Sequence, residues 1–98
     1  MILYIGPVPK GIVPLWSITL TVSILWCVDV ETVKNALCLH AQGDWGDVSE
    51  DERVRNNKAL AGGGTLRSVH TDPYGAVFEI ITEADRSITR VQLLDEEC

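Results

Sequence analysis

The stretch that decides the fold reads WSITLTVSILW and spans residues 16–26. As far as Ser23, its large apolar side chains fall on one parity and its hydroxyl side chains on the other. A period of two places the large side chains on one face of an extended strand, whereas a helix would scatter the hydroxyls around its circumference. The pattern predicts a β-strand whose apolar face consists of Trp16, Ile18, Leu20, Val22, Ile24 and Trp26.

This expected strand is long for a small domain. At about 3.3 Å per residue it would extend about 35 Å, roughly twice the usual length. We expect it to bend, to bulge, or to continue past its own sheet and pair with a second copy of the chain. The sequence therefore predicts a homodimer formed through the N-terminal strand. Residues 1–9 read as a short strand followed by an irregular segment with two prolines.

A membrane or secretory segment is the alternative interpretation of residues 11–28, which contain no charged side chain. Pro14, four hydroxyl residues and a length below the ~20 residues of a spanning helix favour the strand. Trp26 and Cys27 also offer no small-residue cleavage site. Both interpretations stay open, and we expect a cytoplasmic protein without membrane contact.

Length and charge indicate one acidic domain over residues 1–98. The formal net charge is −6, and residues 1–27 contain a single charged side chain, Lys10. An acidic surface repels the phosphate backbone, so we expect no direct nucleic-acid binding. It could keep a small protein soluble or meet a basic partner. Three cysteines without CxxC spacing predict reduced thiols, with neither a zinc knuckle nor a closed disulfide framework, at Cys27, Cys38 and Cys98.

Two helices and three strands are predicted in the rest of the chain. A helix over residues 29–40 places Val33, Ala36, Leu37 and His40 on one face. A second helix over residues 49–60 begins with the capping box Ser49-x-x-Glu52 and ends at Gly62-Gly63-Gly64. Strands follow at residues 65–71, 76–82 and 87–94, the first two joined by a turn at residues 71–75.

The order β-α-α-β-β-β predicts an α+β fold. We expect an antiparallel sheet of about four strands with both helices packed on one face. The apolar side chains of the N-terminal strand would form the wall that the helices cover.

Two blocks resemble a family of small uncharacterised proteins of bacterial plasmids and other mobile elements. The first is HAQGDWGD at residues 40–47, and the second is ITEADRS at residues 81–87, with Thr89 following. The resemblance covers about residues 38–94 and implies a mobile-element origin but no reaction. Between the blocks, it includes Asn56, Ala59, Leu60, Gly63, Gly64, Leu66 and Ser68. The chain departs from the family pattern near its end, where leucines stand without the expected proline.

The first block offers candidate ligands for a divalent metal ion. His40, Asp44 and Asp47 surround a glycine turn, and Glu83 or Asp85 could complete the site. The favoured interpretation is structural: Asp44 caps a turn, Trp45 fills the core, and Asp47 precedes a helix. His40 would then lie at a helix C-terminus, where a cation is favoured.

The second block concentrates charge in Glu83, Asp85 and Arg86, which could form a local ion pair at a hairpin corner. Alternatively, Asp85 or Arg86 reaches the Asp44–Trp45 turn and joins both blocks into one polar binding surface.

The sequence favours a non-enzymatic interaction or regulatory protein whose partner is a host protein. No catalytic triad or phosphate-binding motif occurs, so we assign no catalytic residue and no cofactor or resident metal. One alternative is a small metal-dependent hydrolase that uses His40, Asp44 and Asp47. Another is a small-ligand module with a pocket lined by Trp45 and Tyr74.

Overall fold

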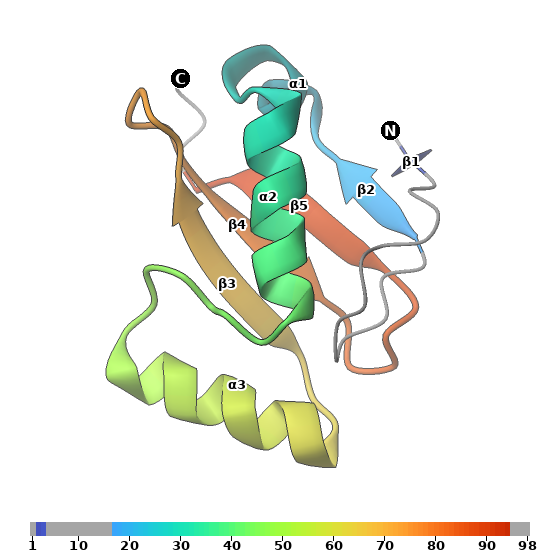
Figure 1. The fold of residues 1–98 in the computed structure, drawn as a ribbon. Helices are drawn as coiled ribbons and strands as arrows, with labels where there is room; N and C mark the ends of the chain where they lie inside the picture. The colour runs from blue at the N-terminus through green and yellow to red at the C-terminus, as the bar shows by residue number, and fades with distance from the viewer. Residues whose placement is uncertain (1, 4–16, 95–98) are drawn as a thin grey trace.

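The computed structural model describes residues 2–3 and 17–94 and has an α+β fold (Figure 1). Its five-stranded sheet has the order β1-β2-β5-β4-β3. The elements are β1 (Ile2–Leu3), β2 (Ile18–Leu20), α1 (Val22–Cys27), α2 (Val30–Ala41), α3 (Glu50–Gly62), β3 (Leu66–Thr71), β4 (Val77–Thr82) and β5 (Thr89–Leu93). The fold class and the three C-terminal strands predicted from the sequence are confirmed.

The sheet is mixed, because β2 pairs with β5 in parallel while the other neighbours are antiparallel. The expectation of a purely antiparallel sheet is wrong for this pair. After β2 the chain crosses the sheet face in α2, and the β3–β4–β5 meander then brings the last strand back in the direction of β2 (Figure 1). Strand β2 therefore lies inside the sheet, paired with β1 on one side and β5 on the other.

The long N-terminal strand predicted over residues 16–26 is wrong beyond Leu20. Thr21 has an extended backbone, and its Oγ1 accepts a hydrogen bond from the Ile24 amide at 3.3 Å, which starts helix α1. Ile24 stays buried, but Val22 and Trp26 are exposed instead of forming a wall for the helices. Trp16 lies outside the described residues. Because β2 is paired with β1 on one side and β5 on the other, it offers no free edge for the predicted dimer contact.

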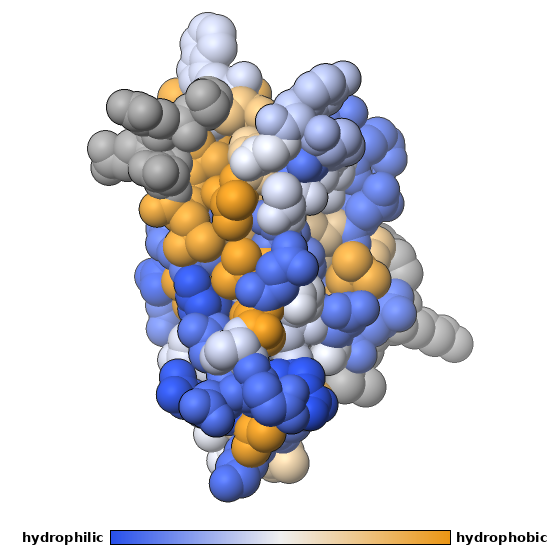
Figure 2. Space-filling view, turned by 90° about the vertical axis from the view of Figure 1, so that its left-hand side faces the viewer, coloured by the Kyte–Doolittle hydropathy of each residue, from blue (hydrophilic) through white to orange (hydrophobic). Residues whose placement is uncertain are grey.

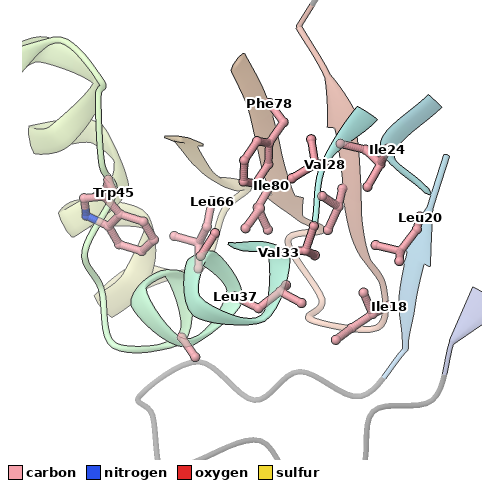
Figure 3. Packing of buried hydrophobic residues seen from close by; sticks show 13 residues of the cluster. Ile18, Leu20, Ile24, Val28, Val33, Leu37, Trp45, Leu66, Phe78 and Ile80 are labelled. Atoms are coloured by element: carbon pink, nitrogen blue, oxygen red, sulfur yellow. The ribbon is translucent and has the colours of Figure 1, made fainter. Parts of the chain in front are cut away.

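The core forms between α2 and one face of the sheet (Figures 1 and 3). The predicted face of α2 is confirmed, since Val33, Ala36, Leu37 and His40 are all buried. Period-two alternation is visible in β4, where Phe78 and Ile80 are buried between half-buried neighbours. Thus α2 contributes the buried face that the sequence predicts, while β4 supplies Phe78 and Ile80, which the sequence analysis did not assign to the core.

Helix α3 lies beside the β3 end of the molecule rather than across the sheet face, which corrects the predicted packing (Figure 1). Asn56 is its buried residue, and Val54 is exposed. Figure 2 shows its surface, at the bottom of the view, as largely hydrophilic. The predicted N-cap is confirmed, because Ser49 Oγ accepts from the Glu52 amide at 3.2 Å. The Glu52 carboxylate pairs with Arg67 instead of returning to the cap.

The cysteines differ from the expected set of reduced thiols. Cys27 is disulfide-bonded, and Cys38 on α2 is a half-buried free thiol. Because disulfides are typical of oxidising compartments, Cys27 does not support the cytoplasmic location expected from the cysteine count. Among the described residues, no helix has the length and apolar character needed to cross a membrane.

Candidate functional site

A chain of buried polar side chains surrounds His40, the first residue of the first block. His40 Nδ1 lies 2.7 Å from Ser68 Oγ, and Nε2 lies 2.8 Å from Thr82 Oγ1. The chain continues at each end, from Thr82 Oγ1 to Thr89 Oγ1 at 2.9 Å and from Ser68 Oγ to His70 Nε2 at 2.9 Å. All five residues are buried, so this histidine–hydroxyl network ties α2 to the three strands of the meander.

His40 is a neutral imidazole in this network. Burial lowers its pKa from 6.5 to about 3, and the charges of His70 and Arg86 act in the same direction. Burial also lowers the pKa of His70, although Asp44 and Asp47 oppose that effect. A neutral imidazole has one donor and one acceptor nitrogen. Both nitrogens of His40 are engaged by hydroxyl groups, so neither is left to bind a metal ion.

The carboxylates of the two aspartates in the first block accept hydrogen bonds from the protein and are not arranged around an ion site. Asp44 Oδ1 accepts from the Gly46 amide at 3.1 Å, and Asp47 Oδ2 accepts from Thr71 Oγ1 at 3.2 Å. Within the described part of the chain, no three His, Cys, Asp or Glu side chains are grouped as a metal site would require. The geometry supports the structural interpretation of this block.

Trp45 and Tyr74 lie in different environments, so they do not line a common pocket. The Trp45 side chain is only 3% exposed and makes an edge-to-face contact with His40, with ring centroids 5.5 Å apart. Its Nε1 donates to Asn57 Oδ1 on α3 at 2.9 Å. Tyr74, in the β3–β4 turn, is 93% exposed. These positions do not support the small-ligand pocket.

The first block also covers the outer edge of β3. The Val69 amide donates to the Trp45 carbonyl at 3.1 Å, and the Asp47 amide donates to the Val69 carbonyl at 2.8 Å. Together they form one parallel bridge between Gly46 and Val69. Gly46 has a φ of +67°, and a Cβ atom there would lie 2.1 Å from the Val69 carbonyl oxygen. Only glycine permits both the backbone conformation and the close approach.

Asn56 on α3 also pairs with the outer edge of β3, and its side-chain amide takes the place of a backbone peptide group. Its Nδ2 donates to the Arg67 carbonyl at 2.7 Å, and its Oδ1 accepts from the Arg67 amide at 3.0 Å. The outward backbone groups of Arg67 and Val69 are therefore all paired. Sequence reasoning did not select Asn56 or Asn57 as site residues. Asn56 is among the positions of the resemblance, and the two asparagines form a polar pair within a helix, but neither signal identifies their partners.

The second block forms the β4–β5 turn and holds the end of α3. The Arg86 guanidinium donates to the carbonyls of Gly64 at 2.5 Å and Ala59 at 3.0 Å. Arg86 itself has a φ of +65°. Asp85 Oδ1 accepts from the Ser87 amide and hydroxyl. The acid of the local ion pair is Glu83, but its partner is Arg90 at 2.8 Å rather than Arg86.

The two blocks do meet, but through different residues from those expected. Asp85 hydrogen-bonds to Ser87, and Arg86 donates to the carbonyls of Gly64 and Ala59, rather than to the Asp44–Trp45 turn. The contact between the blocks is made by His40 of the first, which hydrogen-bonds to Thr82 of the second. Ser68, Thr82 and Thr89 all belong to the positions of the resemblance, but sequence reasoning did not select them as site residues because buried hydroxyls on strands carry no distinctive pattern. The matched blocks thus meet in the interior instead of forming one polar surface.

No protein-family model, curated protein or solved structure matches this chain. The resemblance of the two blocks to mobile-element proteins therefore stays a prediction.

We predict that His40 makes the fold sensitive to acid. Below pH 6.5 the unfolded chain binds a proton that folded His40, with a pKa of about 3, does not. The free energy of unfolding should therefore fall by about 1.4 kcal/mol per pH unit as the pH decreases through this window. Urea unfolding measures the slope, and His40→Gln, which offers a donor and an acceptor without titrating, should reduce it. An imidazole NMR titration midpoint for His40 near 6.5 would contradict the prediction.

We also predict that Gly46→Ala destabilises the fold by about 3 kcal/mol or more, since it combines backbone strain with a clash against Val69. Gly62→Ala is the control, because nothing lies within 4 Å of its added Cβ and its φ is not positive. That variant should change stability by less than about 1 kcal/mol. Equal effects of the two substitutions in urea unfolding would show that the Gly46–Val69 approach is not a constraint.

Proposed function

We propose that this protein is a small non-enzymatic interaction protein that forms a homodimer through its α1 surface. We define the α1 surface as the exposed apolar side chains of α1 and the start of α2, namely Val22, Leu25, Trp26 and Val30. The observation that carries the proposal is Trp26, whose side chain is 83% exposed beside Val22 at 62%. Exposed apolar groups that gather on one element mark interaction sites, and tryptophan is enriched among residues that dominate binding energy.

The occupant proposed for the α1 surface is a second copy of the chain. Residues 17–28 contain no charged side chain, so two copies can approach there without opposing like charges. Val22 and Trp26 are four residues apart on one helix and share a face. In a twofold arrangement, Trp26 of each copy would pack on the apolar side chains of the other. This proposal moves the expected dimer contact from the N-terminal strand to the following helix.

The proposal that the protein is not an enzyme is supported by the hydrogen bonds of His40, Asp44 and Asp47, the candidate catalytic residues. Both nitrogens of His40 bind hydroxyls, and the carboxylates of Asp44 and Asp47 accept from Gly46 and Thr71. These groups hold the fold and are not directed at a common point. No observation favours the metal-dependent hydrolase.

The acidic remainder of the chain is proposed to face a second partner with a basic surface. Five acidic side chains occur between residues 44 and 52, which contain the turn that pairs with Val69 and the start of α3. A mobile-element origin, implied by the resemblance, points to a host protein as that partner. Complementary charge would speed the encounter more than it would strengthen the complex.

Sedimentation equilibrium over a range of concentrations tests the homodimer. We predict that Trp26→Ser raises the dimer dissociation constant by about 30-fold, equivalent to about 2 kcal/mol. Tyr74→Ser is the matched control, because it removes another exposed aromatic ring outside the α1 surface. Added salt should strengthen the dimer by screening the repulsion between two chains of charge −6. A wild-type protein that stays monomeric, or a Trp26→Ser variant that dimerises normally, would reject the proposal.

A further inference from the structure

We propose that the histidine–hydroxyl network is a pH-sensitive switch. Protonation of His70, at the β3 end of the network, reverses the hydrogen bonds as far as Thr89 on β5 and moves the ring proton of His40 from Nδ1 to Nε2. The network joins two imidazoles and three hydroxyl groups in one line, in the order His70, Ser68, His40, Thr82 and Thr89. The switch does not involve the α1 surface, and His40 itself stays neutral throughout.

The number of protons in the network limits its hydrogen bonds to two directions. A neutral imidazole has one N–H group, and a hydroxyl group donates only one hydrogen bond. Each nitrogen of His40 faces a hydroxyl oxygen, so His40 donates to one neighbour and accepts from the other. In one direction it donates to Ser68 through Nδ1, and in the other it donates to Thr82 through Nε2.

While both imidazoles are neutral, only the direction from Thr89 to His70 gives every buried donor an acceptor. Thr89 donates to Thr82, and Thr82 donates to Nε2 of His40. Nδ1 of His40 then donates to Ser68, and Ser68 donates to Nε2 of His70. The proton left over lies on Nδ1 of His70. In the described part of the chain, no side-chain nitrogen is buried without a partner, so this nitrogen, which has none, is open to water.

The opposite direction places the surplus proton at the buried end of the network. It leaves a hydroxyl proton of Thr82 or Thr89 without an acceptor, because neither hydroxyl has a partner outside the network among the described residues. His70 is 8% exposed, whereas the other four members are 0% to 1% exposed. A buried donor without an acceptor costs free energy. The neutral network therefore keeps the protons of both histidines on Nδ1.

Protonation of His70 removes the acceptor at the end of this line. Both ring nitrogens of an imidazolium are donors, so Nε2 now donates to Ser68. Ser68 turns its proton to Nδ1 of His40, and His40 then donates from Nε2 to Thr82. Thr82 in turn donates to Thr89. His70 gains one proton from water, each hydroxyl keeps one, and His40 carries one before and after the change.

The charge on His70 favours this reversal over a break at Ser68. A break would leave the Ser68 proton without an acceptor and the remaining donors directed toward the cation. In the reversed direction the donors point away from His70, so the negative end of each dipole faces the charge. Hydrogen bonds in such a chain also polarise one another, which favours a common direction. The hydroxyl left without an acceptor is then that of Thr89, at the far end.

The charged groups around the network make His70 the first histidine to take up a proton. Burial lowers the pKa of His70, but Asp44 and Asp47 in the adjacent turn oppose that effect. Its ring neighbour on β4, Phe78, is uncharged. The pKa of His40 is about 3, because burial and the charges of His70 and Arg86 all oppose its protonation. His40 can therefore respond to the charge on His70 without acquiring one.

NMR spectra that correlate the ring C–H protons with both ring nitrogens test the switch, because they report which nitrogen carries a proton. We predict that His40 and His70 both carry it on Nδ1 at neutral pH. As the pH falls through the His70 transition, the His40 proton should move to Nε2 with the same midpoint. A His40 proton on Nε2 at neutral pH, a His40 ring that does not respond to His70, or unfolding while His70 is still neutral would each overturn the proposal.

Two variants test whether the histidines communicate through the network. In Ser68→Ala, His70 should still titrate, but the His40 proton should no longer move with it. Ser87→Ala is the control, because its hydroxyl donates to Asp85 outside the network, and it should keep the coupled transition. His70→Gln offers a donor and an acceptor without titrating, so the His40 proton should stay on one nitrogen. This variant carries the comparison if Ser68→Ala does not fold. A His40 transition that persists in either folded variant would overturn the proposal.

Discussion

The rest of this structure depends on the burial of His40 with both ring nitrogens hydrogen-bonded. The imidazole joins α2 to Ser68 on β3 and Thr82 on β4, and Thr82 passes the connection to Thr89 on β5. A buried polar group stabilises a fold only when it is paired, and the loss of one partner costs about 1–3 kcal/mol. The network therefore requires one relative placement of the helix and the meander. It also joins the two sequence blocks, since His40 comes from the first and Thr82 from the second.

Polar contacts also organise the outside of the sheet. On the side of the sheet where Arg67 projects, Glu79 accepts from Arg67 Nε and from Gln92 Nε2, each at 2.7 Å, so one carboxylate joins β3, β4 and β5. Arg67 extends the connection to Glu52 on α3. With Asn56 on the β3 edge, Asn57 bound to Trp45 Nε1, and Arg86 at its C-terminal end, α3 is held at four points by side chains that hydrogen-bond. The domain thus combines an apolar core under α2 with a helix, α3, that adds these polar contacts to the packing of Ala59 and Leu60 against that core.

The sequence predicts those parts of the fold that depend on local signals. Ser49 begins α3, the glycines after residue 61 end it, and the buried face of α2 follows from its helical spacing. It fails at Thr21, because a hydroxyl in an alternating strand and a helix cap look alike over a few residues. The outcome there depends on β5, whose Val91 carbonyl accepts from the Thr21 amide at 3.2 Å. The candidate site is harder still, since the partners of His40 lie 28 and 42 residues away.

The close approach of Gly46 to Val69 has a consequence for the protein in a crowded solution. An uncovered β3 would expose unpaired amides and carbonyls next to an apolar core, which is how ordered aggregates begin. Trp45, Asp47 and Asn56 pair with the outward backbone groups of β3 and so prevent neighbouring molecules from stacking on this strand. Gly46, which permits this tight turn, therefore also protects the molecule against irreversible self-assembly. The requirement for glycine at this position would hold even if the free energy of unfolding were large.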